Sequence, residues 1–180
     1  ASTHRIPVLQ PERASTAPVV EEMRRFAPDA AVVVAYGQLL KSNFLSVPRY
    51  GCINVHASLL PKYRGPSPIQ SVILAGDRET GVTSMLMNEG LDTGDILLQR
   101  TIEIIEEDTA GTLHDKLAEL GATLMVETLD RLEQGEIVPQ PQDHGKATRT
   151  AKITKADARL DWRQSPQAMQ NRVRAFDPWP

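Results

Sequence analysis

The chain has 180 residues, of which 41% are hydrophobic, so it is long enough to bury a core as one domain with an appendage. Its net charge of −3 gives no sign of a dominant nucleic-acid-binding surface, although a local basic patch stays open. No apolar run approaches the roughly 20 residues that span a bilayer, so no membrane segment is expected. The single Cys52 argues against a disulfide framework and indicates a reducing compartment.

The first third of the sequence alternates short apolar runs with helical patterns. Residues 6–9 are predicted to form a strand, and Thr16 suits the N-cap of the helix that follows. Residues 30–36 are continuously apolar and β-branched, which predicts a strand covered on both faces of a parallel sheet. A short helix over 41–47 then leads to a second buried strand, residues 52–56, which we expect to pair with the first in parallel.

The middle of the sequence predicts a helix, an antiparallel strand pair and a long helix. The first helix is bounded by prolines at its start and glycine at its end, over residues 66–76. Strands over 81–87 and 96–105 are joined by a Gly-rich loop, which favours antiparallel pairing. Thr112 and Asp115 suit a capping box for a long helix whose buried stripe is Leu113, Leu117, Leu120, Leu124 and Leu132. Alternating helices and strands indicate an α/β fold.

From residue 139 the composition shifts to Pro, Gln and charged residues, which predicts a domain boundary. We therefore divide the chain into a domain over 1–138 and a linker over 139–180. The linker carries a sparse basic segment and one predicted helix, residues 166–175. The sequence also begins without Met and ends on Trp-Pro, which leads us to expect a fragment of a longer protein.

Two polar side chains stand out at the end of the strand over 52–56. Because side chains alternate along a strand, Asn54 and His56 project from the same face. Ligands of open α/β sheets bind outside the carboxyl ends of the strands, where this pair lies. An amide and an imidazole at that place suit a polarised carbonyl oxygen. Each residue alone also suits an ordinary buried hydrogen bond, so the spacing leaves both interpretations open.

A carboxylate that could orient His56 lies further along the chain. Asp92 is flanked by Gly90 and Gly94, a pattern that occurs in simple turns and also lets backbone approach a ligand closely. Asp95 is a competing carboxylate that spacing does not eliminate, although its place at the start of a strand favours a cap or solvent.

Two other kinds of site fit the sequence less well. Ser58 lacks the Gly-x-Ser-x-Gly context of a hydrolase nucleophile, so a turn role is favoured. Cys52, His56, Asp92 and His114 show none of the spacings typical of metal ligands, and no GxGxxG or P-loop motif is present.

Several longer motifs run through nearly the whole chain: residues 54–61 (NVHASLLP), 63–65 (YRG), 68–70 (PIQ), 81–83 (GVT), 90–97 (GLDTGDIL), 110–114 (AGTLH), 141–144 (PQDH) and 174–180 (RAFDPWP). In these motifs the sequence resembles the N10-formyltetrahydrofolate transferase superfamily. Three of its runs, AYGQ over 35–38, LDTGD over 91–95 and the ending FDPWP, are similar to the methionyl-tRNA formyltransferase members. This resemblance implies a Rossmann-like formyltransferase domain, with a mainly parallel sheet and an antiparallel strand pair.

The resemblance also implies an active site. Asn54, His56 and Asp92 would form a catalytic triad, in which Asn54 binds the oxyanion, His56 moves a proton and Asp92 orients His56. A folate pocket would be lined by Tyr36, Gly37, Gln38, Leu39, Leu40, Ser58, Leu59, Leu60, Pro61, Glu89, Gly90, Leu91 and Thr93. The implied formyl donor is 10-formyltetrahydrofolate, with no metal, and the implied acceptor is the α-amino group of initiator methionyl-tRNA.

The same resemblance sets expectations about context and leaves alternatives open. Family members begin with a strand, helix and strand before the equivalent of Ile6, and they continue into a C-terminal β-barrel. We therefore expect an internal fragment, monomeric, from the bacterial cytoplasm or from a mitochondrial or plastid matrix. Its activity alone stays open. Other formyltransferases, acting on a nucleotide-sugar amine or on glycinamide ribonucleotide, are alternatives. So is a truncated, non-catalytic folate-binding module.

Overall fold

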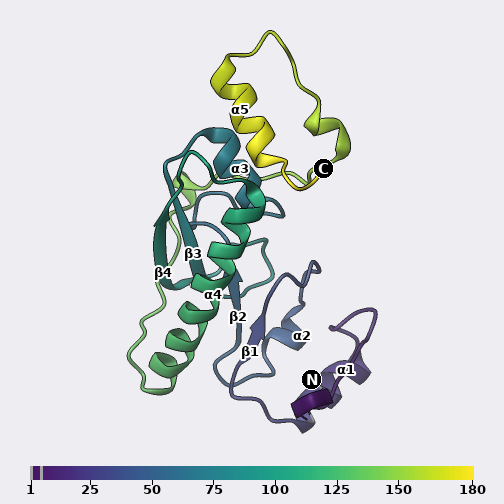
Figure 1. Ribbon diagram of the computed structural model, residues 1–180. Helices are drawn as coiled ribbons and strands as arrows, with labels where there is room; N and C mark the ends of the chain where they lie inside the picture. The colour runs from purple at the N-terminus through teal and green to yellow at the C-terminus, as the bar shows by residue number, and fades with distance from the viewer. Residues whose placement is uncertain (1, 5) are drawn as a thin grey trace.

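The computed structural model describes residues 2–4 and 6–180 as one mixed α/β unit (Figure 1). The strands are β1 (Ala31–Val33), β2 (Cys52–His56), β3 (Glu79–Leu86) and β4 (Ile96–Glu103). The helices are α1 (Ala17–Arg25), α2 (Ser42–Leu45), α3 (Pro68–Ala75), α4 (Ala110–Glu133) and α5 (Pro166–Ala175), with 3₁₀ turns at Ser2–His4, His144–Lys146 and Lys155–Ala158. The predicted α/β class is confirmed.

The described strands form one sheet in the order β1-β2-β3-β4. β1 and β2 are parallel, as predicted, and β3 and β4 form the predicted antiparallel pair. β2 and β3 are antiparallel as well, which the sequence did not predict. The reason is that α3, about 12 Å long by the rise of an α-helix, stays at one end of the sheet and packs against α5 (Figure 1). The chain therefore re-enters the sheet at the end where β2 leaves it.

The prediction for the first strands needs correction. β1 spans only three residues, and Val32 and Val34 are 45% and 63% exposed, so the strand is not covered on both faces. β1 is the edge of the sheet that the described residues form, and its buried side packs against Val20 of α1 and Phe44 of α2. Residues 6–9 form no strand, and their apolar side chains are exposed.

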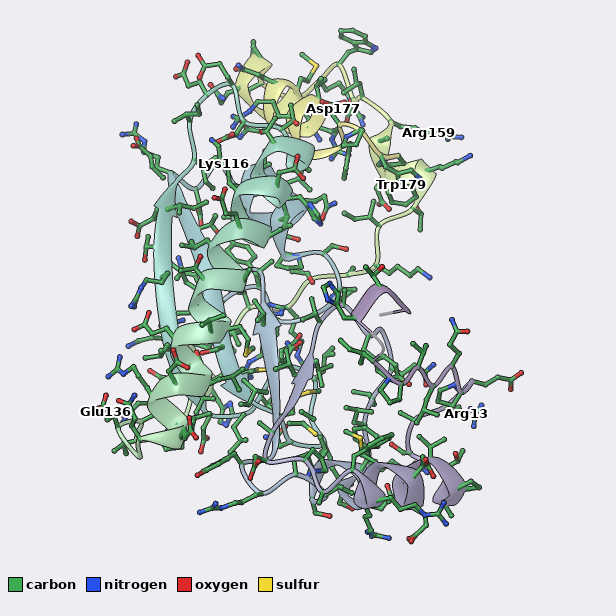
Figure 2. The ribbon with its side chains drawn as sticks, turned by 60° about the horizontal axis from the view of Figure 1, so that its bottom comes forward. Arg13, Lys116, Glu136, Arg159, Asp177 and Trp179 are labelled. Atoms are coloured by element: carbon green, nitrogen blue, oxygen red, sulfur yellow. The ribbon has the colours of Figure 1, made fainter. Side chains whose placement is uncertain are left out.

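The long helix α4 covers one face of the sheet. Three leucines of the predicted stripe, Leu113, Leu117 and Leu124, are at most 2% exposed, and the other two, Leu120 and Leu132, are half-buried and pack against the core. Gly121 lets the helix approach β2, because a Cβ there would lie 3.0 Å from Val55 Cγ1. The capping box, however, is formed by Thr109 and Thr112 rather than by Thr112 and Asp115. Figure 2 shows Lys116 at the end of α4 nearest Asp177, and Glu136 beyond its other end.

Residues 139–180 fold back onto the rest of the chain. The Arg64 amide donates to the Thr148 carbonyl at 2.9 Å, and the Thr150 amide donates to the Arg64 carbonyl at 2.7 Å. α5 forms over the predicted residues, with Ser165 accepting from the Ala168 amide as its cap, and Ala175 is fully buried. The predicted division into a domain and a linker stays a prediction, but the predicted linker has extensive contacts with the sheet domain.

Candidate active site

Asn54 and His56 both lie on β2, which forms over the residues that the sequence predicts. Because they are two positions apart, their side chains leave the same face of the sheet, about 7 Å apart along the strand. His56 is opposite Thr83 and is 6% exposed, whereas Asn54 is half-buried opposite Met85. An amide and an imidazole thus project from the same face of β2, which is an inner strand of the sheet that the described residues form.

The ring of His56 is fixed by a backbone carbonyl. His56 Nε2 lies 2.9 Å from the carbonyl oxygen of Tyr63, which can only accept, so Nε2 carries a proton and donates. The other nitrogen, Nδ1, lies 3.7 Å from Asp92 Oδ2, which is beyond hydrogen-bond range. The sequence missed Tyr63, because every residue has a carbonyl and no residue type announces this role. Tyr63 adopts a left-handed φ of 61°, a conformation that bulky residues rarely take.

Asp92, rather than Asp95, is the carboxylate near His56. Its backbone is left-handed, with φ of 52°, which an Asp tolerates better than most residues. Its Oδ2 accepts a hydrogen bond from the Gly65 amide at 2.7 Å, and its side chain is 13% exposed. The Asp92 carboxylate thus lies 3.7 Å from Nδ1 of His56, while the Tyr63 carbonyl holds the ring at Nε2.

The turn after β2 is held by side-chain hydrogen bonds. Ser58 Oγ donates to the Lys62 carbonyl at 2.7 Å and is fully buried, so the expected turn role is confirmed. Thr83 Oγ1 donates to the Ser58 carbonyl at 2.6 Å and accepts from the Leu60 amide at 3.1 Å. Thr83 lies on β3 opposite His56, so these bonds hold residues 58–61 close to His56.

The other predicted pocket residues come from two loops that one hydrogen bond joins. Glu89 Oε1 accepts from the Ser42 amide at 3.1 Å, which links the loop over 89–93 to the start of α2. Leu39 and Leu91 are 66% and 53% exposed and offer apolar surface, but Leu40 is buried in the core. Tyr36 and Gln38 hydrogen-bond the segment before α1, and Thr93 bonds Asn88. A folate pocket at these residues stays a prediction.

A cavity lies next to the turn after β2. Its volume is about 250 Å³, and its lining includes Leu59 of the predicted pocket together with Tyr63, Val72, Asp77 and Thr80. The Tyr63 hydroxyl donates to Asp77 there, and burial together with that carboxylate raises the pKa of Tyr63. His114 is exposed on α4 and contacts Asp115, and residues 2–4 and 6–180 contain no cluster of three or more His, Cys, Asp or Glu that could hold a metal. None of the described helices is long and apolar enough to cross a membrane.

Comparison with known sequences defines the class of protein. The Formyl transferase family model matches residues 2–129, and the model of the formyl transferase C-terminal domain matches residues 152–180. The chain therefore belongs to the formyl transferase family.

Curated relatives with high sequence identity have a more specific name. A protein of Citrifermentans bemidjiense named methionyl-tRNA formyltransferase is 48% identical over 180 residues, which are 100% of this chain and 57% of that protein. One of the same name from Caldanaerobacter subterraneus is 49% identical over 176 residues, which are 97% of this chain and 57% of that protein. The chain thus spans a little over half the length of the curated relatives that it matches.

Solved structures with the same fold are more distant in sequence. HypX from Aquifex aeolicus, in complex with tetrahydrofolic acid, matches 89% of this chain and 28% of its own with a TM-score of 0.77 and 22% identity. An N-formyltransferase from Helicobacter canadensis, in complex with folinic acid and dTDP-3-aminofucose, matches 77% of this chain and 51% of its own with a TM-score of 0.69 and 24% identity. These likenesses confirm the formyltransferase fold.

Proposed function

We propose that this chain carries the catalytic centre of a methionyl-tRNA formyltransferase. In this reaction the formyl group of 10-formyltetrahydrofolate passes to the α-amino group of methionine on initiator tRNA. The observation that carries the proposal is the meeting of His56 and Asp92 at the end of β2, in a chain whose relatives at 48% identity have that name.

In the proposed chemistry each of the three side chains has a separate role. The amine attacks the formyl carbon, a C–N bond forms, and the carbonyl becomes a tetrahedral oxyanion. Asn54 donates to this oxyanion, a contribution that in other enzymes is worth about 10²–10³ in rate. His56 accepts the proton of the attacking amine at Nδ1 and passes it to the departing N10 of the folate, while Nε2 stays bonded to Tyr63. Asp92 stabilises the doubly protonated ring.

The formyl donor in the proposal is a reduced folate. Two of the matched structures contain tetrahydrofolic acid or folinic acid, which supports a folate site in this fold. The exposed Leu39 and Leu91 supply apolar contact for a pteridine ring, and the turn over 58–61 lies beside His56. Formyl transfer needs no metal. The bacterial origin of the relatives supports the cytoplasm as the compartment.

The test is formyl transfer by the complete polypeptide that carries these 180 residues, with labelled 10-formyltetrahydrofolate. Methionyl-tRNA and a dTDP-3-amino sugar are offered as separate acceptors. We expect transfer to methionyl-tRNA only, with Asn54→Ala lowering its rate about 10²-fold. Transfer only to the sugar amine would make the chain a sugar formyltransferase. Folate binding without transfer to either acceptor would make it a binding module.

A further inference from the structure

A buried side chain from the predicted linker reaches the loop that carries Asp92. Gln142 is 6% exposed, and its Nε2 donates to the carbonyl oxygens of Asp92 at 3.0 Å and of Gly94 at 2.7 Å. The loop has little room to adjust by itself, because a Cβ on Gly94 would lie 1.7 Å from the Leu86 carbonyl oxygen. Gln142 therefore ties two closely packed backbone positions on either side of Thr93.

The other end of the Gln142 amide is held by a buried arginine. Arg64 is 5% exposed, and its Nε and Nη2 both donate to Gln142 Oε1, at 3.0 and 2.6 Å. Arg64 Nη2 also lies 3.1 Å from His144 Nδ1, and since a guanidinium only donates, this nitrogen accepts. Within residues 2–4 and 6–180 Arg64 forms no ion pair with a carboxylate, so the Gln142 oxygen is its main buried partner.

The orientation of the Gln142 amide is determined by its partners. Its oxygen faces a group that can only donate, and its nitrogen faces two carbonyls that can only accept. A rotated amide would lose all of these bonds, so the side chain has one orientation.

Gly65, the residue after Arg64, connects the same network to the Asp92 carboxylate. The Gly65 amide donates to Asp92 Oδ2 at 2.7 Å, so the Asp92 carboxylate is held through Gly65 and its backbone through Gln142. Both supports meet at Arg64, which is adjacent to Gly65 and bonds Gln142. The same loop carries the Tyr63 carbonyl that orients His56. One network thus fixes both members of the His56–Asp92 pair from outside.

We propose that Gln142 is a positioning residue of the formyl-transfer site, and that Arg64 holds it in place. The start of the predicted linker then belongs to the active site, because without it the Asp92 loop loses two hydrogen bonds. This inference rests on the proposed function, in which Asp92 acts on His56. Among the described residues, the Gln142 side chain forms hydrogen bonds with Arg64, Asp92 and Gly94 rather than with His56, so its effect passes through the position of Asp92.

The first experiment measures kcat and KM for Gln142→Ala in the complete polypeptide. We expect kcat to fall about 10–100-fold, since small misplacements of a catalytic group have effects of this size. KM for the formyl donor should change less than about 3-fold, because the bonds that are lost act on a catalytic group. Gln140→Ala is the matched control: Gln140 belongs to the same segment, but its side chain is exposed and, within the described part of the chain, bonds only the Val138 carbonyl. Equal rates for the two variants would overturn the proposal.

A second variant keeps the test valid if Gln142→Ala does not fold. Gln142→Glu preserves size and still offers Arg64 an acceptor, as an ion pair, but it replaces the donor to the two carbonyls by an acceptor. We expect this variant to fold and to lose at least as much turnover as a folded Gln142→Ala. Wild-type turnover in Gln142→Glu would overturn the proposal, because the donor function would then be dispensable.

The decisive measurement is a double-mutant cycle with Asp92→Ala. If Gln142 acts through Asp92, Gln142→Glu should cost less than about 3-fold when Asp92 is already absent. An equal loss in both backgrounds would show a general structural role and overturn the proposal. Asp92→Ala alone distinguishes failure of the proposed function from failure of this inference. If Asp92→Ala leaves turnover unchanged, the proposed triad is wrong. If Asp92→Ala has a large effect and Gln142→Glu has none, only the positioning role of Gln142 is rejected.

Discussion

Two largely buried aspartates, Asp92 and Asp108, differ in how many hydrogen bonds their carboxylates accept and in which basic residue lies beside them. Asp108 is 2% exposed, and both of its oxygens bond Lys116 Nζ, at 2.7 and 2.9 Å. Thr112 Oγ1 and the Ile105 amide also donate to it, at 2.9 and 3.1 Å. By contrast, Asp92 receives one hydrogen bond from the described residues, from the Gly65 amide, and has His56 at 3.7 Å.

The difference separates a structural carboxylate from one suited to chemistry. Both carboxylate oxygens of Asp108 accept hydrogen bonds, and the ammonium group of Lys116 lies against them. Burial acts to raise the pKa of Asp108, but the hydrogen bonds from Lys116, Ile105 and Thr112 outweigh burial and hold it below the ordinary value. Asp92 keeps an oxygen free of hydrogen bonds to the described residues, and its basic neighbour is the imidazole of His56 rather than a lysine.

The surroundings of Asp108 explain what it stabilises. Arg174 of α5 donates to the Asp108 carbonyl at 2.8 Å and to the Ile105 carbonyl at 3.0 Å. The Gly111 amide at the start of α4 donates to the Asp177 carbonyl, and Figure 2 shows Lys116 and Asp177 at this end of the molecule. Asp108 therefore links the segment after β4 to the start of α4 through its side chain, and to α5 through its backbone carbonyl.

The largest effect is expected from Asp92→Asn. This change keeps the shape of the side chain and removes its charge, so turnover should fall about 10²–10⁴-fold, as it does when the aspartate of other triads is neutralised. The free energy of unfolding should change by less than about 1 kcal/mol, because an amide oxygen can still accept from Gly65. Steady-state kinetics and urea unfolding of the same preparation check both parts. A large loss of stability would make Asp92 structural as well.

Asp108→Asn should show the reverse pattern. We expect a loss of about 2 kcal/mol in the free energy of unfolding, the size typical of hydrogen bonds to charged groups. Lys116 is 44% exposed and can return to water, so the cost of an isolated buried charge does not arise. Turnover of the folded enzyme should stay within about 3-fold of wild type. Equal losses of turnover in the two asparagine variants would abolish the distinction between the carboxylates.

The smallest effect is on acid stability. The folded-state pKa of Asp108 lies below its ordinary value of 3.8. Its contribution to the free energy of unfolding is therefore present above that ordinary value and is lost as the pH falls through the folded-state pKa. The stability difference between wild type and Asp108→Asn should therefore shrink below about pH 4. Urea unfolding between pH 3 and 7 measures it. A difference that stays constant over this range would mean that the charge of Asp108 contributes nothing.

Sequence patterns located the elements that short-range rules control. β2 and α5 form over the predicted residues, since a short buried apolar run and a Ser-Pro helix start are local signals. Local patterns did not predict that β1 lies at the edge of the sheet or that Val32 is exposed. The coverage of a strand depends on which elements pack against it. The capping box was misplaced by one turn, since Thr109 and Thr112 offer equally good caps and the contacts of Asp108 decide between them.

By itself the sequence determined the α/β class, the shared face of Asn54 and His56, and the motifs that resemble formyltransferases. Alternation along a strand and residue identity are properties of the chain, so no packing information was needed. Spacing left Asp92 and Asp95 both open, and the resemblance to formyltransferases implied Asp92. Only the tertiary structure showed Asp92 at 3.7 Å from His56, brought the Tyr63 carbonyl to His56, and placed the Gln142 side chain against the Asp92 loop. These contacts join segments distant in sequence, or use backbone atoms that every residue has. Their partners are set by how the segments pack.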